Sequence, residues 1–302
     1  MSQRLQMLQV ARLARRTLGD AAELVVSFLH SLAAPGGGFC NRAGRPDLYY
    51  TSFAIDALVA LDAVAVTGPQ AEATRSYLDS FGDGSGLDFV HRCCLARAWA
   101  SQPADAFPPP RRAALLAGVA QHRAADGGYN SRARAASGTA YGCFLAMNAH
   151  ADLRQPLGET GPEADAIAAC VRSLRTADGG FANSAGQPEG STTATAAAIA
   201  TLRGLGRPVP DGVAEWLLAR RHPDGGFTAA PDAPVPDLLS TAVALHALDA
   251  LDAPWREHRE SMLDFLDTLW TAEGAFHGSW ADDEPDAEYT FYGLVALGHC
   301  SV

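Results

Sequence analysis

The sequence predicts an all-α protein of six helical hairpins whose helices form two concentric rings, an α6/α6 arrangement. The first observation behind this prediction is a set of glycine-rich marks, spaced about 43 to 52 residues apart along the 302-residue chain. The second is that a polar loop and then an apolar, helix-like run follow each mark. Repeated units of this length bury their faces against one another. The marks are Gly36-Gly37-Gly38-Phe39, Asp83-Gly84-Ser85-Gly86, Asp126-Gly127-Gly128-Tyr129, Asp178-Gly179-Gly180-Phe181, Asp224-Gly225-Gly226-Phe227 and Glu273-Gly274-Ala275-Phe276.

The fifth repeat shows what one unit contains. Residues 211–221 predict a first helix with one apolar face, which His222-Pro223-Asp224-Gly225-Gly226 ends because proline cannot continue a helix. Residues 237–251 predict a second helix that is apolar almost all round, so it should be buried on most sides. Six such pairs place the first type of helix outside and the second type inside. The inner ring must enclose a central space, and ligand sites favour such concave places.

The composition excludes several classes of function. A net charge of −11 argues against a nucleic-acid or anionic-membrane partner. Every basic side chain other than histidine is arginine, and the absence of lysine excludes Schiff-base chemistry and a P-loop lysine. The six cysteines show no CxxC spacing, which favours reduced thiols in a cytoplasmic protein.

The chain reads as one domain over residues 1–302, because no linker-like change in composition divides it. Its first 30 residues alternate arginines with apolar residues in a helical pattern. We therefore expect an amphipathic helix there, and neither a signal peptide nor a membrane span.

The inner helices share a T-x-x-A-x-x-A-L-like run, and aligning them on it predicts where each begins. Aspartate and serine are favourable first residues because their side chains accept a hydrogen bond from a free backbone N–H. The carboxylates among them are therefore expected to cap helices, to ring one mouth of the central cavity, or both. The predicted starting positions are Asp47, Asp88, Ala136, Ser191, Asp237 and Asp286.

The repeats resemble the β subunits of protein prenyltransferases and the squalene–hopene cyclases. The resemblance extends from about Ala21 to Leu297, and it rests on the repeated D-G-G-[FY] marks and on the runs that open the fifth and sixth inner helices. It implies an α6/α6 toroid with an apolar central cavity for isoprenoid chains, and it raises the possibility of a partner subunit of the helical-repeat α type. Those two runs are Asp237-Leu238-Leu239-Ser240-Thr241-Ala242 and Asp286-Ala287-Glu288-Tyr289-Thr290-Phe291-Tyr292-Gly293-Leu294.

The metal site of the resembled transferases is not preserved. Their zinc ligands include the Asp and Cys of a D-x-C run and the His of a D-x-x-H-T run. Here these positions are Asp237, Leu239 and Tyr289, and one carboxylate with a leucine and a tyrosine is a poor zinc site. The loop that should supply the diphosphate clamp, residues 229–234, carries no cation. We therefore predict no zinc or other cofactor, with Mg²⁺ at the acidic run described below as the alternative.

The acid of the resembled cyclases is only partly preserved. Their D-x-D-D-T-A run protonates an alkene or epoxide through its middle aspartate, and Asp237 is the one aspartate left in the matching run. A buried carboxyl whose pKa is raised by desolvation can act as a general acid. Asp237 is therefore the candidate catalytic acid, with Tyr289, Asp286 and Glu288 beside it.

Aromatic residues on the inner helices are candidates to line a ligand cavity. Helical periodicity turns about half of them toward neighbouring helices, where plain core packing is the alternative. His91 and Cys94 can share a helix face, but two ligands on one helix do not close a metal site. The candidate ligand-binding residues are Tyr49, Tyr50, His91, Tyr141, Phe291 and Tyr292.

The densest charge run, Asp282-Asp283-Glu284-Pro285-Asp286-Ala287-Glu288, precedes the sixth inner helix. It predicts either a solvated loop or an acidic mouth that binds a cation such as Mg²⁺. Arg42, Arg45, Arg132 and Arg134 lie in loops after the first and third marks, and arginine–aspartate pairing is expected wherever these loops share a rim.

Three functions remain open at the level of sequence. The first is a toroid that binds an isoprenoid or another lipid-like ligand without the ancestral chemistry. The second is a divergent, zinc-independent prenyltransferase or terpene cyclase, which requires an open cavity with a buried, pKa-shifted carboxyl against apolar walls. The third is a structural or partner-binding subunit, which predicts a lumen filled by side chains.

Overall fold

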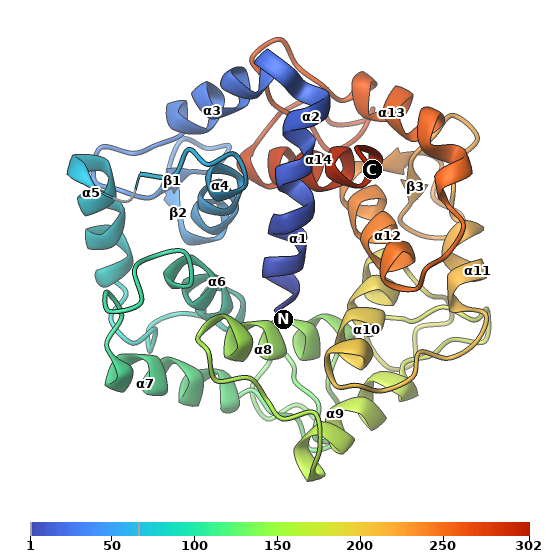
Figure 1. Cartoon of the computed structure of the whole chain (residues 1–302). Coiled ribbons are helices and arrows are strands. Elements are labelled where there is room, and N and C mark those ends of the chain that lie inside the picture. The colour runs from blue at the N-terminus through green and yellow to red at the C-terminus, as the bar shows by residue number, and fades with distance from the viewer. Residues whose placement is uncertain (1, 66) are drawn as a thin grey trace.

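The computed structural model describes residues 2–65 and 67–302, and over these residues six outer and six inner helices alternate around a closed ring (Figure 1). This confirms the predicted α6/α6 toroid. The ring closes because the last inner helix packs against both the fifth and the first. The inner helices are α4 (Leu48–Ala60), α6 (Phe89–Trp99), α8 (Ala140–Asp152), α10 (Thr192–Gly204), α12 (Leu238–Ala250) and α14 (Ala287–Cys300). The outer helices are α3 (Ala22–Ser31), α5 (Gly68–Asp79), α7 (Pro109–Ala120), α9 (Pro162–Ser173), α11 (Val213–Leu218) and α13 (Arg259–Thr268).

Each inner helix begins at a residue whose side chain accepts a backbone N–H from its first turn. Five of the six predicted starting positions are confirmed, and the third is wrong, because the cap of α8 is Thr139 rather than Ala136. Alanine has no side-chain acceptor, whereas the Thr139 hydroxyl accepts the N–H of Gly142 at 2.9 Å. The caps are Asp47, Asp88, Thr139, Ser191, Asp237 and Asp286.

A hydrogen bond four residues after each cap explains the recurring threonine of the repeat. The hydroxyl at this position accepts the backbone N–H of the aromatic residue that ends the preceding mark, as Thr241 does for Phe227 at 2.9 Å. The bond ties the loop of each mark to the first turn of its inner helix. The same contact joins Thr51 to Phe39, Thr195 to Phe181 and Thr290 to Phe276, and Cys143 takes the threonine position for Tyr129.

The second repeat, whose mark is the least regular, achieves the same link by other means. Arg92 occupies the position four residues after the cap, and its guanidinium donates to the carbonyl oxygens of Gly84 and Ser85 within the mark. It also donates to Gly118 in α7 at 2.8 Å. The Arg92 side chain alone therefore makes the link between mark and inner helix that a threonine and an aromatic residue make together in other repeats.

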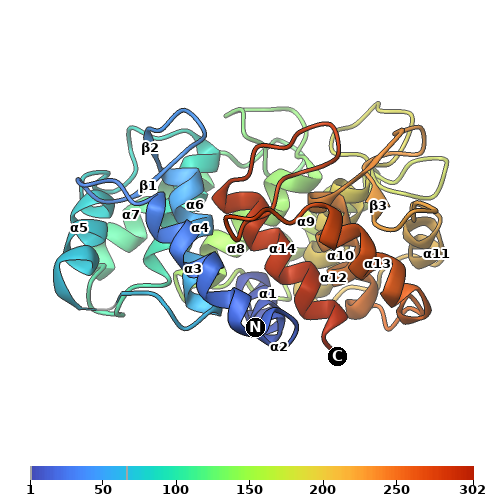
Figure 2. The ribbon, with the colours of Figure 1, turned by 90° about the horizontal axis from the view of Figure 1, so that it is seen from above.

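Two short hairpins and the loops of the marks gather on the face where the inner helices begin (Figure 2). In the first hairpin β1 (Phe39–Cys40) pairs with β2 (Pro46–Asp47), and in the second β3 (Phe227–Thr228) pairs with β4 (Pro236–Asp237). Both are antiparallel, and each leads directly into an inner helix. The hairpins thus position the starts of α4 and α12.

The outer helix of the fifth repeat is shorter than predicted. Residues 211–221 were expected to be helical, but α11 spans only Val213–Leu218. Its first turn follows Gly212 in a left-handed conformation, and Arg221 already pairs with Phe227 in an isolated bridge. The following mark needs glycine, because Gly225 has φ +93° and a side chain there would collide with the carbonyl of Ser261.

The prediction of one helix over residues 1–30 is wrong for the part that the structure describes; its first residue, Met1, lies outside the described residues. The chain forms α1 (Gln3–Ala11), a 3₁₀ turn (Arg12–Ala14), α2 (Arg15–Leu18), a second 3₁₀ turn (Gly19–Ala21) and then α3. The break falls at Gly19, which has φ +53°. After this break α3 joins the outer ring, whereas α1 runs across the middle of the ring (Figure 1).

Buried polar contacts hold α1 against the ends of the inner helices. Arg4 donates to the Asp56 carboxylate of α4 at 2.8 Å, and both side chains are buried. Arg97 of α6 donates to the other Asp56 oxygen at 2.6 Å. A buried carboxylate needs such partners, because an unpaired one is strongly destabilising. These contacts fix α1 as the floor of the ring.

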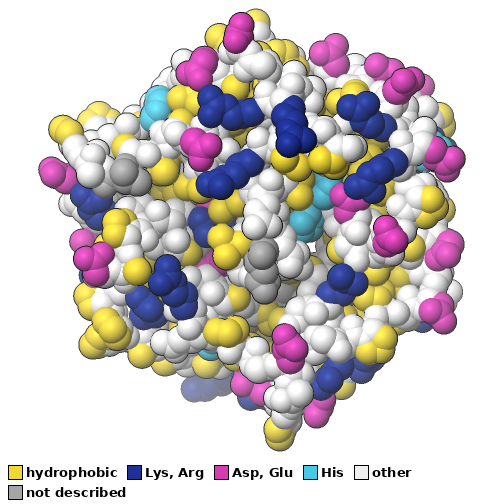
Figure 3. All heavy atoms as spheres, in the orientation of Figure 1, with side chains coloured by type: hydrophobic (Ala, Val, Ile, Leu, Met, Phe, Trp, Pro, Cys, Tyr) yellow, Lys and Arg dark blue, Asp and Glu magenta, His cyan; other side chains and the backbone are white. Residues whose placement is uncertain are grey.

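Figure 3 shows the face that α1 crosses, where arginine side chains gather over α2 and its neighbours. The chain nevertheless carries a net charge of −11. Over the described residues, none of the helices has the length and the apolar character that crossing a membrane requires.

Candidate functional site

The centre of the ring holds a cavity of about 450 Å³, which we call the lumen. It lies between α8, α10, α12 and α14, and α1 closes it at the end where these helices finish. One of its walls is α10, whose small side chains Ala196, Ala197 and Ala200 leave the space open. The apolar lining is Met7, Phe144, Ala194, Ala196, Ala197, Ile199, Ala200, Leu239, Val243, Ala247 and Ala250.

Most polar side chains of the lining lie at the two ends of the lumen. Tyr49, Tyr141, Asn183 and Glu288 lie at the end where the inner helices begin, which we call the mouth. Gln3 and His246 lie at the opposite end, which we call the floor. The lumen therefore suits a molecule with a long apolar middle.

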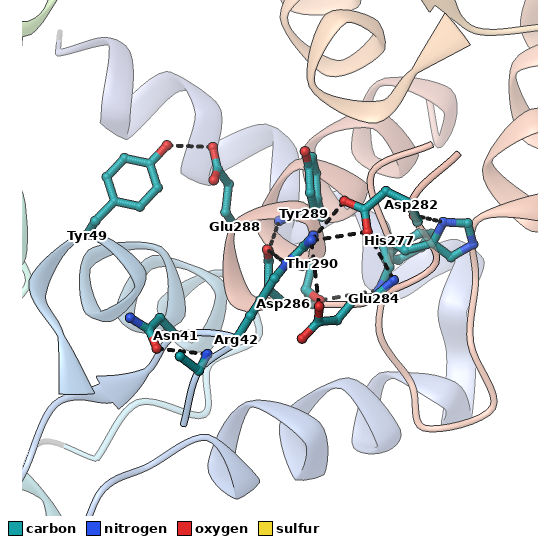
Figure 4. Close-up of polar contacts among 12 residues, drawn as sticks. Asn41, Arg42, Tyr49, His277, Asp282, Glu284, Asp286, Glu288, Tyr289 and Thr290 are labelled. Atoms are coloured by element: carbon teal, nitrogen blue, oxygen red, sulfur yellow. Dashed lines mark hydrogen bonds and ion pairs between the residues drawn. The ribbon is translucent and has the colours of Figure 1, made fainter. Parts of the chain in front are cut away.

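Glu288 is the carboxyl group that faces the lumen. The Tyr49 hydroxyl of α4 donates to its Oε1 at 2.6 Å, across the junction where the ring closes (Figure 4). Burial raises the pKa of Glu288 to about 7; the Tyr49 hydrogen bond opposes this shift, and the neighbouring Asp286 carboxylate adds to it. Near neutral pH this carboxyl holds a proton for part of the time, and it does so against apolar walls.

Arg42 occupies the centre of the acidic run beside the mouth. Its Nε donates to Asp286 at 2.9 Å and its Nη1 to Asp282 at 2.8 Å, while Glu284 lies 4.0 Å away (Figure 4). The Asp286 side chain is buried, and burial raises its pKa although Arg42 and the N–H of Tyr289 oppose the shift. The expected arginine–aspartate pairing is thus present at this rim.

The same arrangement does not fit Mg²⁺, because the guanidinium already takes the position that a cation would need. The described residues contain no group of three His, Cys, Asp or Glu side chains placed to hold a metal ion. The carboxylates of the run act here as partners of an arginine.

The residues at the family's zinc positions do not fit a zinc ion either. Asp237 caps α12 by accepting the N–H of Ser240 at 2.7 Å, and burial raises its pKa. Leu239 faces the lumen with a hydrocarbon side chain, and the Tyr289 ring packs against Gly278. One carboxylate, a leucine and a tyrosine packed against Gly278 do not supply the several N, S or O ligands that zinc requires.

The structure separates the predicted site residues into four groups. Tyr49, Tyr141, Glu288 and Tyr292 line the lumen together. Asp286, Tyr289 and Tyr50 lie beside the mouth, and Asp237 lies in the cap of α12 outside the lining.

Phe291 and His91 lie away from the lumen. The Phe291 ring is buried behind the wall and packs against Phe53, and the Arg97 guanidinium lies 5.1 Å from its centre. His91 bonds to its own helix cap, Asp88, at 2.9 Å, and its side chain is about one third exposed. Helical periodicity had left both possibilities open for these positions.

Sequence reasoning missed the polar groups of the floor. His246 lines the lumen and is hydrogen-bonded to His299, which in turn bonds to Asp249. The sequence does carry a signal for these groups, because His246 and Asp249 are the polar residues in the otherwise apolar end of the fifth inner helix. His299 is its counterpart at the end of the sixth.

The closed ring of helical hairpins, with an apolar lumen and a polar mouth, defines a toroid of the kind shared by prenyltransferase β subunits and terpene cyclases. The chain belongs to the prenyltransferase alpha-alpha toroid family, whose model matches residues 2–93, 90–220 and 208–300. No curated protein sequence matches the chain.

Solved structures with the same fold come from both branches. Protein geranylgeranyltransferase-I of Candida albicans, complexed with GGPP, superposes with a TM-score of 0.69 at 13% identity, over 91% of this chain and 90% of that one. The type II terpene cyclase MstE of Scytonema, as an R337A variant in complex with geranylgeranyl dihydroxybenzoate, gives a TM-score of 0.62 at 14% identity, over 95% and 98% of the two chains. At these identities the likeness shows the fold.

Proposed function

We propose that this protein binds an isoprenoid or a similar branched apolar chain in its lumen. The observation that carries the proposal is the apolar wall of α10 and α12, which extends from the mouth to the floor. A cavity of about 450 Å³ lies in the range of small-molecule sites. Each buried methylene contributes about 0.8 kcal/mol, so a long chain supplies most of the affinity without polar contacts.

A polar groove next to the mouth supports an amphiphilic ligand. This groove, of about 370 Å³, shares Tyr141 and Asn183 with the lumen and is also lined by Asn130, Arg132 and Ser184. Hydroxyl and amide groups with a single arginine suit a neutral or singly charged head group. They do not supply the several cations that a diphosphate needs.

The test is equilibrium binding of geranylgeraniol to the purified full-length protein. The wild-type protein should bind it, and Ala197→Phe should bind at least about tenfold more weakly because the ring fills the lumen. Ala113→Phe, which adds the same ring on the exposed surface of α7, is the matched control and should bind as the wild type does.

Circular dichroism and thermal unfolding show whether each variant keeps its fold, and Ala197→Leu offers a smaller replacement if Ala197→Phe does not. Absence of binding to the wild-type protein contradicts the proposal. So does equal binding to the wild type and to a folded Ala197 variant.

Acid catalysis on the bound chain is a second candidate function, favoured by Glu288. This carboxyl faces the apolar lumen, holds a proton for part of the time near neutral pH and is oriented by Tyr49. It meets the requirement for a zinc-independent transferase or cyclase better than Asp237, whose carboxylate is engaged in capping α12. Tyr289 and Asp286 would then support the mouth rather than react.

We also propose a cytoplasmic location, because all six cysteines, which lie within the described residues, are free thiols. A helical-repeat partner subunit remains a prediction from the resemblance. Size-exclusion chromatography with light scattering on protein captured from its native cells tests it.

A further inference from the structure

A chain of hydrogen bonds leads from the lumen floor into the wall. His246 Nδ1 lies 3.1 Å from His299 Nε2, and His299 Nδ1 lies 2.5 Å from an oxygen of Asp249. At its other nitrogen, Nε2, His246 lies 3.1 Å from the side-chain oxygen Oε1 of Gln3 in α1. We call His246, His299 and Asp249 the relay. Figure 1 shows α12 and α14, which carry it, beside α1, and Figure 3 shows histidine side chains next to α1 on this face.

The far end of the relay is firmly anchored. The second oxygen of Asp249 accepts the indole N–H of Trp255 at 2.7 Å and pairs with Arg256 at 2.8 Å. His299 is 2% exposed, so its imidazole touches the lumen only through His246. The arrangement exposes one imidazole to the lumen and places a carboxylate behind it.

Two proton arrangements satisfy every bond of the relay, one for each orientation of the Gln3 amide, because an ionised Asp249 can only accept. In the first, His299 donates its Nδ1–H to Asp249 and His246 donates its Nδ1–H to His299. His246 Nε2 then bears a free electron pair, to which Gln3 donates once its amide has turned its NH₂ group toward this nitrogen. In the second, one proton has been added, His299 is an imidazolium paired with Asp249, and His246 donates its Nε2–H to the Gln3 oxygen.

The two arrangements differ by one proton that enters at His246 Nε2. As it enters, the Nδ1 proton of His246 passes to His299, and the Gln3 amide turns from donor to acceptor. Burial and the nearby His299 lower the pKa of His246 to about 3, so this imidazole itself stays neutral. Although burial opposes the shift, the bonds from His299 and Trp255 hold the pKa of Asp249 below its usual range. The Asp249 carboxylate bonds directly to His299, so the imidazolium of the second arrangement lies beside its counter-ion.

We propose that His246, supported by His299 and Asp249, is a proton acceptor for the inner end of a chain bound in the lumen. The proposal rests on the proposed function, and specifically on acid catalysis by Glu288 at the mouth. The chemical class is an isoprenoid that carries a transient positive charge on carbon. The lumen then has a proton donor at one end and a proton acceptor at the other.

The step balances without another reactant. Glu288 gives its proton to a double bond of the chain, whose π electrons form the new C–H bond and leave a cation. A C–H bond next to the cation then breaks, its electron pair closes a new double bond, and the proton goes to His246 Nε2. The product is an isomer of the ligand; Glu288 has lost one proton and the relay has gained one, which solvent restores.

The charged and titratable groups around the relay limit where the proton can go. These groups are Asp249 on α12, Arg256 in the turn before α13 (Arg256–His258) and Arg259 in α13. Arg259 donates to the Cys300 carbonyl at 2.5 Å. The Cys300 thiol of α14 is buried, and burial raises its pKa to about 12. Of these groups, Asp249 alone is an anion that stabilises an imidazolium.

The first experiment is ¹⁵N NMR of the histidine side chains in the ligand-free, full-length protein, titrated with acid. The added proton should appear on His299 and not on His246. Asp249→Asn should move this uptake at least one pH unit lower, because the counter-ion is lost. Asp252→Asn, an exposed aspartate in the next turn, should leave it unchanged. Uptake on His246, or no response to Asp249→Asn, overturns the relay.

The second experiment incubates geranylgeraniol with the protein in D₂O and follows deuterium in the ligand by mass spectrometry. The wild type should incorporate deuterium, and His246→Gln and Glu288→Gln should each reduce incorporation at least tenfold while geranylgeraniol still binds. Asp249→Asn should reduce it mainly at neutral pH, which a merely structural role would not do. Equal incorporation by the wild type and a folded His246→Gln overturns the proposal, as does binding by the wild type without incorporation.

The two experiments separate failure of this inference from failure of the proposed function. If the wild type does not bind geranylgeraniol, the proposed function fails, and the acceptor role toward that chain fails with it. The NMR titration needs no ligand, so it still decides whether the relay takes up a proton.

Discussion

Glu288 and Arg42 show two ways in which a single side chain manages charge at the mouth of the lumen. Among the residues that the structure describes, no cation hydrogen-bonds to Glu288; burial raises the pKa of its carboxyl to about 7, and the Tyr49 hydroxyl donates one hydrogen bond to it. Arg42, in the loop between β1 and β2, neutralises Asp286 and Asp282 directly. The Glu288 carboxyl therefore has a proton available for chemistry, whereas pairing with Arg42 neutralises the Asp286 and Asp282 carboxylates.

The raised pKa of Glu288 predicts a change of stability with pH. Its native pKa of about 7 lies above the ordinary 4.5, so the folded protein binds more protons than the unfolded chain between these values. Stability should therefore fall as pH rises from 5 to 8, by at most about 3 kcal/mol from this residue. Glu288→Gln should remove this component in urea unfolding curves.

The matched control for this comparison is Glu72→Gln, which changes an exposed glutamate on α5. It should retain the pH dependence of the wild type. Equal losses of stability by Glu288→Gln and the wild type between pH 5 and pH 8 would contradict a buried, pKa-shifted carboxyl at this position.

Replacing Arg42 should expose the cost of the buried Asp286. Arg42→Met should lower stability by about 2 kcal/mol, since it leaves a buried carboxylate without its cation. The loss should be greater at pH 8 than at pH 5, because protonation relieves the unpaired charge. Arg45→Met, in the same loop but exposed, should change stability by less than about 0.5 kcal/mol. An equal effect of both substitutions would contradict the assigned pairing.

At the scale of the elements, one short unit recurs: a cap, and four residues later a side chain that holds the preceding loop. Asp237 and Thr241 form this unit in α12, and Asp88 with Arg92 forms its altered version in α6. The unit fixes both where a helix begins and how the loop of the mark lies on it. This explains why the repeats remain recognisable although their faces differ.

The third repeat tests this unit, because its cap was predicted at the wrong residue. Thr139→Ala should cost about 1 kcal/mol by removing the acceptor of the Gly142 N–H. Ala136→Ser should leave the free energy of unfolding nearly unchanged, since that exposed side chain lies before the helix. Thermal or urea unfolding measures both. A larger loss from Ala136→Ser than from Thr139→Ala would return the cap to residue 136.

At the scale of the whole molecule, closure of the ring decides what the lumen contains. Packing of α14 against α4 brings Glu288 to Tyr49, and the crossing of α1 beneath the inner helices brings Gln3 to His246. A negative net charge surrounds this apolar interior. The molecule as a whole therefore favours neutral ligands over anionic ones.

The negative net charge predicts a ligand preference different from that of a toroid that binds diphosphates. Geranylgeranyl diphosphate should bind at least about tenfold more weakly than geranylgeraniol at low salt. The difference should narrow as salt screens the repulsion. Calorimetry at two ionic strengths measures it. Tighter binding of the diphosphate would show that cations outside the loop at 229–234 form a clamp.

The sequence by itself determined the repeat, the alternation of outer and inner helices and five of the six inner-helix caps. These features depend on local chemistry, such as a proline and glycines that end a helix or an aspartate that accepts an N–H in the next turn. It also determined which residues occupy the family's zinc positions, because Leu239 and Tyr289 are identities that no folding can change. The break at Gly19 was open to the same local reasoning.

Only the tertiary structure decided which side chains meet. Tyr49 and Glu288 are 239 positions apart, and His246 and His299 are 53 apart, so no pattern along one helix reveals either pair. It placed α1 on the floor, turned Phe291 into the wall and Tyr292 into the lumen, and left Asp237 as a cap. The physical reason is that the facing of a helix in a closed ring is set by its two neighbours, and these neighbours are encoded elsewhere in the chain.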